Sequence, residues 1–223
     1  MAVELTFLQS IPYFAGLSHD ELDLVRKLIF EKKVERGDII VLEGEPAEAL
    51  YFVGSGAVKM FRTSVDGKEQ VLSIVRPGES FNDVAIFDSG PNLAGAQAMG
   101  PATVYGILQH DLHAFLQEHP QTALNVTNVL AAQLRHLASL VADLSFQPVV
   151  SRVAKILLEY AGDGASPSQR LTQQDMAAIV GTVREVVGRS LKALETDGVI
   201  RMDRHRIVIT DREALEDIAG VSS

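Results

Sequence analysis

The sequence of 223 residues contains no cysteine. This absence excludes disulfides, thiolate metal sites and cysteine-ligated iron–sulfur clusters. No stretch approaches the roughly 20 apolar residues that a membrane-spanning helix needs. The first residues, MAVELTFLQSIPYF, lack both the basic segment and the long apolar core of a signal peptide. We therefore expect a cytoplasmic protein that does not associate with a membrane.

The chain also lacks an excess of basic residues. Its 29 acidic residues outnumber its 20 lysines and arginines, and the formal net charge is -9. A protein that coats nucleic acid through bulk charge would be basic, so any DNA-binding surface must be local. The hydrophobic content of 47% and the charged content of 22% are ordinary for a globular protein. The length allows one large domain or two modest ones.

Short helices followed by strands are predicted for residues 1–120. Ser18 is followed three residues later by Glu21, which indicates a capping box at the start of a helix. From about Lys32, short β-rich runs alternate with glycine and proline, and Asp66-Gly67 predicts a hairpin between two of them. We count about eight strands, ending near Leu108. This spacing predicts a small antiparallel barrel or roll.

A long helix is predicted to connect this domain to the rest of the chain. A short helix over 109–118 is expected to end at Pro120, and a longer one runs from about 122 to 146, within a connecting segment over 121–147. Pro148 should break the chain's helical path and act as a hinge. Apolar residues recur along the long helix with heptad spacing: Leu130, Leu134, Leu137, Val141 and Leu144. The pattern fits either a helix packed on the roll or a coiled-coil dimer interface, and the narrow seam favours the dimer.

Residues 148–223 contain two amphipathic helices joined at Gly181, within LTQQDMAAIVGTVREVVGRSLKAL (171–194). Thr172 and Thr182 are each followed three residues later by an acidic residue, so a capping box is predicted at the start of both helices. The second helix has one apolar face and one face with two arginines and a lysine. This arrangement predicts a helix-turn-helix whose second helix enters the DNA major groove. The following IRMDRHRIVIT predicts a two-stranded wing.

In this order of elements, the chain resembles the cyclic-AMP receptor protein / fumarate-nitrate reduction regulator family of bacterial transcription factors over essentially its whole length. The most specific stretch is IVGTVREVVGRSLKALETDGVI, and the glycines of DIIVLEGEPAEALYFVGSGAVKM and RPGESFNDVAIFD also match. The resemblance implies an α+β fold with an N-terminal antiparallel β-roll, a long dimerisation helix and a C-terminal winged helix-turn-helix. It further implies a homodimer, not an enzyme, that binds double-stranded DNA and acts with RNA polymerase.

By the same resemblance, Arg184, Glu185 and Arg189 occupy the family's base-reading positions, and the implied half-site is TGTGA in an inverted repeat. The chemistry agrees, because an arginine fork matches guanine O6 and N7 and a glutamate accepts from the cytosine amino group. The alternatives are a solvated helix face and, for Glu185, a role in capping its own helix. Gly188 in mid-helix suggests close approach to DNA or to a neighbouring helix. The predicted phosphate contacts are Thr172, Gln173, Lys192, Arg201, Arg204, His205 and Arg206.

The sensor region departs from the family members that bind cyclic AMP. Leu93 and Ala94 replace the Arg-Ser pair that holds the cyclic phosphate, so no cation is present to neutralise it. Leu137 and Ala138 replace the pair that meets the adenine, and Asp83 keeps the family's ribose-contacting position. The predicted effector pocket comprises Asp83, Val84, Ile86, Leu93, Ala94, Leu134, Leu137 and Ala138. We predict that the protein does not bind cyclic AMP tightly.

The sequence does not determine which effector, if any, takes the place of cyclic AMP. Haem or another apolar ligand is one alternative, with His136 as the iron ligand, and a protein without any effector is the other. His110 and His113 lie three residues apart and could form a metal pair, although a solvated helix face is the favoured interpretation. A cupin-like enzyme is disfavoured because the runs DIIVLEG, ALYFVGSGAVKM and VLSIV carry no histidine. A sensor or scaffold that does not bind DNA is disfavoured by the three intact base-reading residues.

Overall fold

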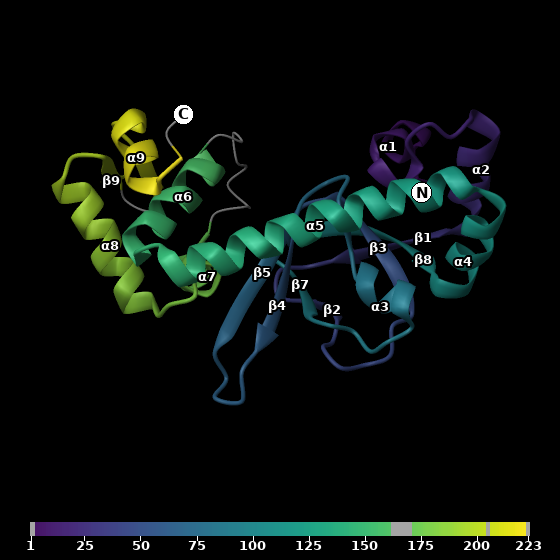
Figure 1. The fold of residues 1–223 in the computed structure, drawn as a ribbon, viewed down its shortest axis with the longest axis horizontal. Helices are drawn as coiled ribbons and strands as arrows, with labels where there is room; N and C mark the ends of the chain where they lie inside the picture. The colour runs from purple at the N-terminus through teal and green to yellow at the C-terminus, as the bar shows by residue number, and fades with distance from the viewer. Residues whose placement is uncertain (1–2, 162–170, 204–205, 222–223) are drawn as a thin grey trace. The chain divides into compact units, whose positions relative to one another are not determined.

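The computed structural model describes residues 3–161, 171–203 and 206–221. The chain divides into two compact units, Met1–Arg62 with Leu72–Leu137 and Thr63–Val71 with Ala138–Ser223. The long helix α5 (Pro120–Phe146) contributes residues to both units (Figure 1).

The first unit begins with helices α1 (Leu5–Ser10), η1 (Pro12–Phe14) and α2 (His19–Leu28). The predicted capping box of α2 is confirmed, because the Ser18 N–H donates to Glu21 Oε2 at 2.7 Å and the Glu21 N–H donates to Ser18 Oγ at 3.4 Å. These bonds favour the ionised carboxyl. The Ser18 backbone N–H, then its hydroxyl and then His119, lower the pKa of Glu21 below its ordinary value of 4.5.

Two four-stranded sheets form the roll, in the orders β1-β8-β3-β6 and β2-β7-β4-β5. The strands are β1 (Ile29–Val34), β2 (Ile39–Val41), β3 (Ala49–Ser55), β4 (Val58–Thr63), β5 (Glu69–Val75), β6 (Ser80–Phe81), β7 (Gly95–Ala98) and β8 (Ala102–Leu108). The eight strands end at Leu108, as predicted. Gly67 has φ +77° in the β4–β5 turn, and its N–H donates to Ser64 O at 2.9 Å, which confirms the hairpin.

Strand β3 shows how the roll is held together, because its side chains alternate between two apolar cores. Leu50 and Phe52 belong to the core that β3 and β8 share with the flanking helices. Tyr51 and Val53 belong to the core between the two sheets. All four side chains are buried, so β3 is apolar on both faces and lies within its sheet rather than at the edge.

Helices α3 (Asp83–Asp88) and α4 (Gln109–Glu118) complete the roll. Helix α5 begins at Pro120, two residues earlier than predicted, so this proline starts the long helix rather than only ending the short one. Proline is tolerated there because the first helical N–H has no intrahelical acceptor. The predicted break at Pro148 is confirmed, since α5 ends at Phe146 and α6 (Val149–Ala161) follows.

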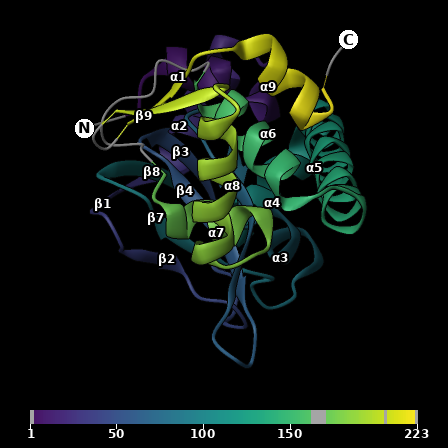
Figure 2. The ribbon, with the colours of Figure 1, turned by 90° about the vertical axis from the view of Figure 1, so that its left-hand side faces the viewer.

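The second unit contains α6, α7 (Gln173–Val180), α8 (Arg184–Thr196), the antiparallel pair β9 (Ile200–Asp203) and β10 (Arg206–Ile209), and α9 (Arg212–Ala219). Figure 2 shows α7 and α8 one after the other beside α6. One apolar core joins the four helices, and its buried members include Leu157, Met176, Leu191 and Leu215. The predicted winged helix-turn-helix is therefore present. Within the described ranges, no helix is both long and apolar enough to cross a membrane.

Candidate nucleic-acid interface

The turn between α7 and α8 is fixed by Gly181, which has φ +67°. The N–H groups of Gly181 and Thr182 both donate to Ala177 O, and they satisfy a carbonyl at the end of α7. A Cβ at position 181 would lie 2.6 Å from Leu144 Cδ2. Glycine is therefore favoured here chiefly by its left-handed backbone, and a larger residue would also have to displace the end of the Leu144 side chain.

The predicted capping box between Thr182 and Glu185 is wrong. Helix α8 begins at Arg184, its N-cap is Val183, and no side chain caps it. The reason is that the Thr182 N–H closes the end of α7, so the chain turns into α8 one residue later. The other predicted box is confirmed, because the N–H of Thr172 donates to Asp175 Oδ2 at 2.9 Å and the N–H of Asp175 donates to Thr172 Oγ1 at 3.1 Å.

Helix α8 has one buried face and one charged, exposed face. Val187, Leu191 and Leu194 are buried in the core of the unit. The exposed face carries Arg184, Glu185, Arg189 and Lys192. Within the described part of the chain, none of these four side chains forms a hydrogen bond or an ion pair. The polar face is therefore free to contact a ligand, and Glu185 is not occupied by capping.

Gly188 lies on the same side of α8 as Arg184 and Glu185, which precede it by four and three residues. A Cβ at position 188 would meet only Gln173 Oε1, at an ordinary contact distance of 3.8 Å. Packing against α7 therefore does not require glycine here. Of the two explanations for Gly188, close packing against a neighbouring helix is therefore not supported within the described residues.

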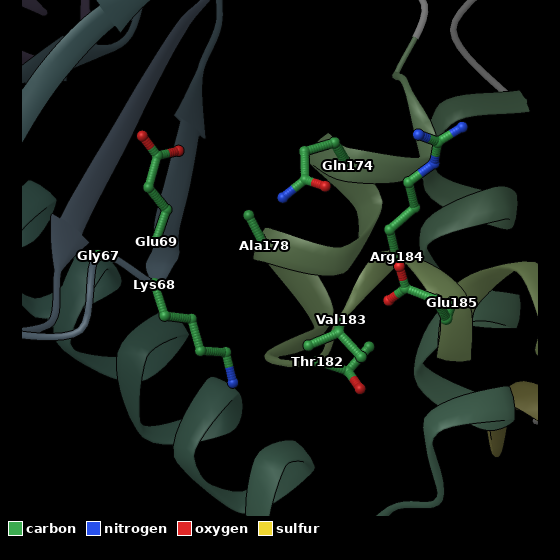
Figure 3. A pocket seen from close by; sticks show the side chains of 9 residues that line it. All are labelled: Gly67, Lys68, Glu69, Gln174, Ala178, Thr182, Val183, Arg184 and Glu185. Carbon is green, nitrogen blue, oxygen red and sulfur yellow. The ribbon is translucent and has the colours of Figure 1, made fainter.

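A hollow in the second unit adjoins the start of α8 (Figure 3). Figure 3 shows Thr182, Val183, Arg184 and Glu185 grouped around the turn between α7 and α8. Gln174 and Ala178 of α7 and residues 67–69 complete the lining. Side chains of the turn and of the first turn of α8 thus project into open space, where another molecule can reach them.

The predicted phosphate contacts occupy different environments. Lys192 and Arg201 are exposed, and Gln173 is half-buried. Thr172 is exposed, but its hydroxyl donates to Asp175 Oδ2 at 2.7 Å. Arg206 belongs to β10, and Arg204 and His205 lie outside the described residues.

Asp83 in the predicted effector pocket is a buried carboxylate whose two oxygens accept hydrogen bonds from the protein. Oδ1 accepts from the hydroxyl of Tyr13 and from the Ser80 hydroxyl at 2.7 Å, and Oδ2 accepts from Gln133 Nε2 at 3.2 Å. Burial, and then the Asp83 charge, strongly raise the pKa of Tyr13, so the phenol stays a donor. No local pattern predicts Tyr13 or Gln133 as partners, because they lie 70 and 50 residues away in sequence.

The other residues of the predicted effector pocket fall into two groups. Ile86 and Ala94 are buried, and Ile86 belongs to the core of the roll. The remaining members are exposed: Val84, Leu93, Leu134, Leu137 and Ala138. Most of the apolar side chains predicted to line the effector pocket are therefore exposed at the surface of the chain, and the others are buried.

The heptad residues of α5 also divide into two groups. Leu134 and Val141 are 68% and 64% exposed, and Leu137 is exposed as well. Leu130 packs against the core of the roll, and Leu144 lies against Gly181. The middle of the seam is thus an uncovered apolar strip, whereas its two ends are covered by the chain itself.

The histidines considered as ligands have structural neighbours or face solvent. His113 Nε2 lies 3.0 Å from Ile86 O, and His110 Nε2 lies 3.3 Å from Asp111 Oδ1. His136 is exposed on α5. Among the described residues, no group of three or more histidine, aspartate or glutamate side chains could hold a metal ion.

Comparisons with known proteins agree with this architecture. Residues 31–119 match the cyclic nucleotide-binding domain family, and residues 151–218 match the Crp-like helix-turn-helix domain family. The chain is 34% identical to a protein of Thermus thermophilus named cyclic AMP receptor protein, over 93% of this chain and 96% of that one. It is 32% identical to a CRP-like cAMP-activated global transcriptional regulator of Mycobacterium tuberculosis, over 91% and 93% of the two chains.

Among solved structures, FixK2 from Bradyrhizobium japonicum aligns with a TM-score of 0.76 at 26% identity, covering 87% of this chain and 99% of that chain. A β-roll of the cyclic-nucleotide-binding type joined by a long helix to a winged helix-turn-helix defines a DNA-binding transcription regulator. The chain belongs to the cyclic-AMP receptor protein / fumarate-nitrate reduction regulator family of bacterial transcription regulators.

Proposed function

We propose that this regulator recognises a TGTGA-like inverted repeat through Arg184, Glu185 and Arg189. The observation that carries this proposal is the exposed face of α8, where these three side chains have no partner in the described part of the chain while the opposite face is buried. Each arginine presents a planar fork to guanine, and Glu185 accepts from a cytosine amino group. Lys192 and Arg201 add phosphate contacts that position the domain without specifying sequence.

Arg189→Ala tests the base-reading role. A bidentate arginine–guanine contact is worth about 1–3 kcal/mol, so the variant should lose about 5- to 150-fold in affinity per half-site. Weak binding that falls with salt should remain, because phosphate contacts are intact. Arg212→Ala is the matched control, since it removes an equal charge from α9, where Arg212 pairs with Glu216 at 2.9 Å. Fluorescence anisotropy with the repeat and with scrambled DNA measures the specific and the non-specific affinity. Full sequence preference in Arg189→Ala would exclude a base-reading role for Arg189.

The proposal includes a homodimer formed along α5. It is supported by the uncovered apolar strip of Leu134, Leu137 and Val141, because exposed apolar side chains at heptad spacing are typical of a helix that packs against a partner helix. In a two-fold dimer the two recognition helices would enter major grooves about 34 Å apart, which requires a near-palindromic operator.

Sedimentation of Val141→Asp tests this interface. The variant should be monomeric at concentrations where the unchanged protein is dimeric, because a charge in an apolar seam is desolvated without a partner. Val65→Asp introduces the same charge at an exposed valine away from α5 and should leave the dimer intact. A Val141→Asp protein that stays dimeric would place the interface elsewhere.

The proposed regulator has lost tight recognition of cyclic AMP, although the Thermus and Mycobacterium relatives described above, among others, carry names that refer to that nucleotide. Leu93 and Ala94 offer no charge to the cyclic phosphate, and the oxygens of Asp83 are already engaged by the protein's own donors. Calorimetry should therefore detect no saturable binding at micromolar cyclic AMP, and DNA affinity should not change when the nucleotide is added. Saturable micromolar binding would contradict this part of the proposal.

The absorption spectrum of the purified protein, together with its DNA binding, distinguishes the alternatives for the effector. A protein purified from a haem-replete host that shows a Soret band with one haem per subunit would be a haem sensor, and His136→Ala would then be the next variant. A colourless protein that binds the repeat without added ligand would be a regulator without an effector. A colourless protein that requires an added compound would be controlled by another small molecule.

A further inference from the structure

We propose that Val183 is a specificity-determining residue that contacts the C5-methyl group of a thymine in the DNA half-site. The proposal rests on the groove assignment of α8 made above and adds a different chemistry to it. Arginine and glutamate recognise hydrogen-bonding groups on base edges, whereas an apolar side chain recognises the methyl group that only thymine presents in the major groove.

The first observation is that Val183 is the N-cap of α8 and leaves that helix without a side-chain cap. Serine, threonine, aspartate and asparagine are preferred at this position because their side chains accept from the free N–H groups of the first turn. Helices α7 and α9 follow that preference, with Thr172 and Asp211 accepting from backbone N–H groups. Valine gives no such bond, so helix formation does not explain its presence.

The second observation is that Val183 is not part of the hydrophobic core. Its side chain is 50% exposed, although the next apolar residue on the inner face, Val187, is fully buried. Figure 3 shows Val183 beside Thr182 at the edge of the hollow, together with Arg184 and Glu185. Core packing therefore does not explain the valine either.

The third observation is that Val183 lies next to the exposed, charged face of α8 that we propose reads the DNA bases. In a helix-turn-helix, the N-terminal residues of the second helix contact base edges. Val183 directly precedes Arg184 and Glu185, whose side chains are exposed and without partners in the described part of the chain. A β-branched apolar group at this point forms a short non-polar patch next to two charged ones. Its complement in DNA is a methyl group next to a guanine or cytosine edge, which a TG step provides.

The test replaces single thymines of the operator by deoxyuridine, which removes the methyl group and leaves base pairing unchanged. The operator is the inverted repeat that the unchanged protein selects from random DNA, so failure of the proposed function would appear as failure to select any repeat. A buried methylene is worth about 0.8 kcal/mol, so loss of one methyl contact should lower affinity about fourfold per half-site and about 15-fold when both half-sites are changed. We expect this penalty at one thymine position.

Three variants separate methyl recognition from helix stability. Val183→Ala should abolish the deoxyuridine penalty while keeping discrimination at the guanines. Val183→Thr should keep part of the penalty, since threonine retains one methyl group, and Val183→Ser should abolish it. Both hydroxyl variants should raise the melting temperature, because each supplies the missing cap. Insensitivity of the unchanged protein at every thymine, or a full penalty in Val183→Ala, would overturn the proposal.

Discussion

Replacing Gly188 by alanine should change folding and DNA binding in opposite directions. Glycine within a helix costs about 0.5–1 kcal/mol relative to alanine because it loses more backbone entropy on folding. The added Cβ would meet only Gln173 Oε1, at 3.8 Å, so no clash offsets this gain. The free energy of unfolding should therefore increase by about 0.5–1 kcal/mol, and the melting temperature should rise by about 1–4 °C for a chain of this size.

The same methyl group would project from the face of α8 that carries Arg184, Glu185 and Arg189. If the DNA backbone or a base edge approaches Gly188 closely, the methyl group must displace it. An inserted methyl in a closely packed contact costs about 1–3 kcal/mol, which corresponds to about 5- to 150-fold in affinity.

The assay combines thermal melting of the free protein with fluorescence anisotropy on the selected operator. The predicted result is a more stable protein that binds DNA more weakly. A Gly188→Ala variant that is less stable would refute the packing argument. A variant that is more stable and binds DNA with unchanged affinity would show that close approach to DNA is not the reason for glycine.

Three further predictions concern stability. Tyr13→Phe removes one donor from the buried Asp83 and should cost about 1–3 kcal/mol in urea unfolding, whereas Tyr105→Phe, at a half-buried tyrosine, is the control and should cost less. Thr172→Ala removes the cap of α7 and should cost about 1 kcal/mol in thermal or urea melts. Because the folded state lowers the pKa of Glu21 below 4.5, its stabilisation is complete above that pH and is lost as the pH falls through the folded value. The stability difference between the unchanged protein and Glu21→Gln should therefore shrink below about pH 4.5, and a difference independent of pH would contradict the assignment.

Several structural features that depend only on neighbouring residues could be predicted from the sequence. The capping boxes at Ser18 and Thr172, the hairpin at Asp66-Gly67 and the break at Pro148 were each predicted from residues within one turn of the feature. The apolar face of α8 followed from helical periodicity. These elements, in their order, were enough to predict the fold class.

Features that depend on the end of one element meeting the start of the next were not predictable in the same way. Thr182 matches the pattern of an N-cap, but its N–H is used to close α7, and this use is decided by Gly181 in a left-handed conformation. Pro120 is compatible with both the end of one helix and the start of another, and the structure has it as the first residue of α5.

The hydrogen-bond partners of Asp83 could not be predicted from the sequence for a different reason. Its partners come from η1, β6 and α5, which only the tertiary fold brings together. The absence of an arginine at Leu93 is, in contrast, a prediction that the family resemblance allows, because that comparison is made at a single position. The sequence could not show that Tyr13 and Gln133 already satisfy the carboxylate.

Selection of binding sites from random double-stranded DNA, with purified protein in the state that binds DNA, tests the central claim most directly. We predict enrichment of an inverted repeat with TGTGA-like half-sites whose centres lie about 10 base pairs apart, one helical turn. The Arg189→Ala protein should enrich no such repeat. Enrichment of an unrelated or asymmetric sequence, or the same repeat with Arg189→Ala, would contradict the assignment of α8 as the base-reading helix of a two-fold dimer.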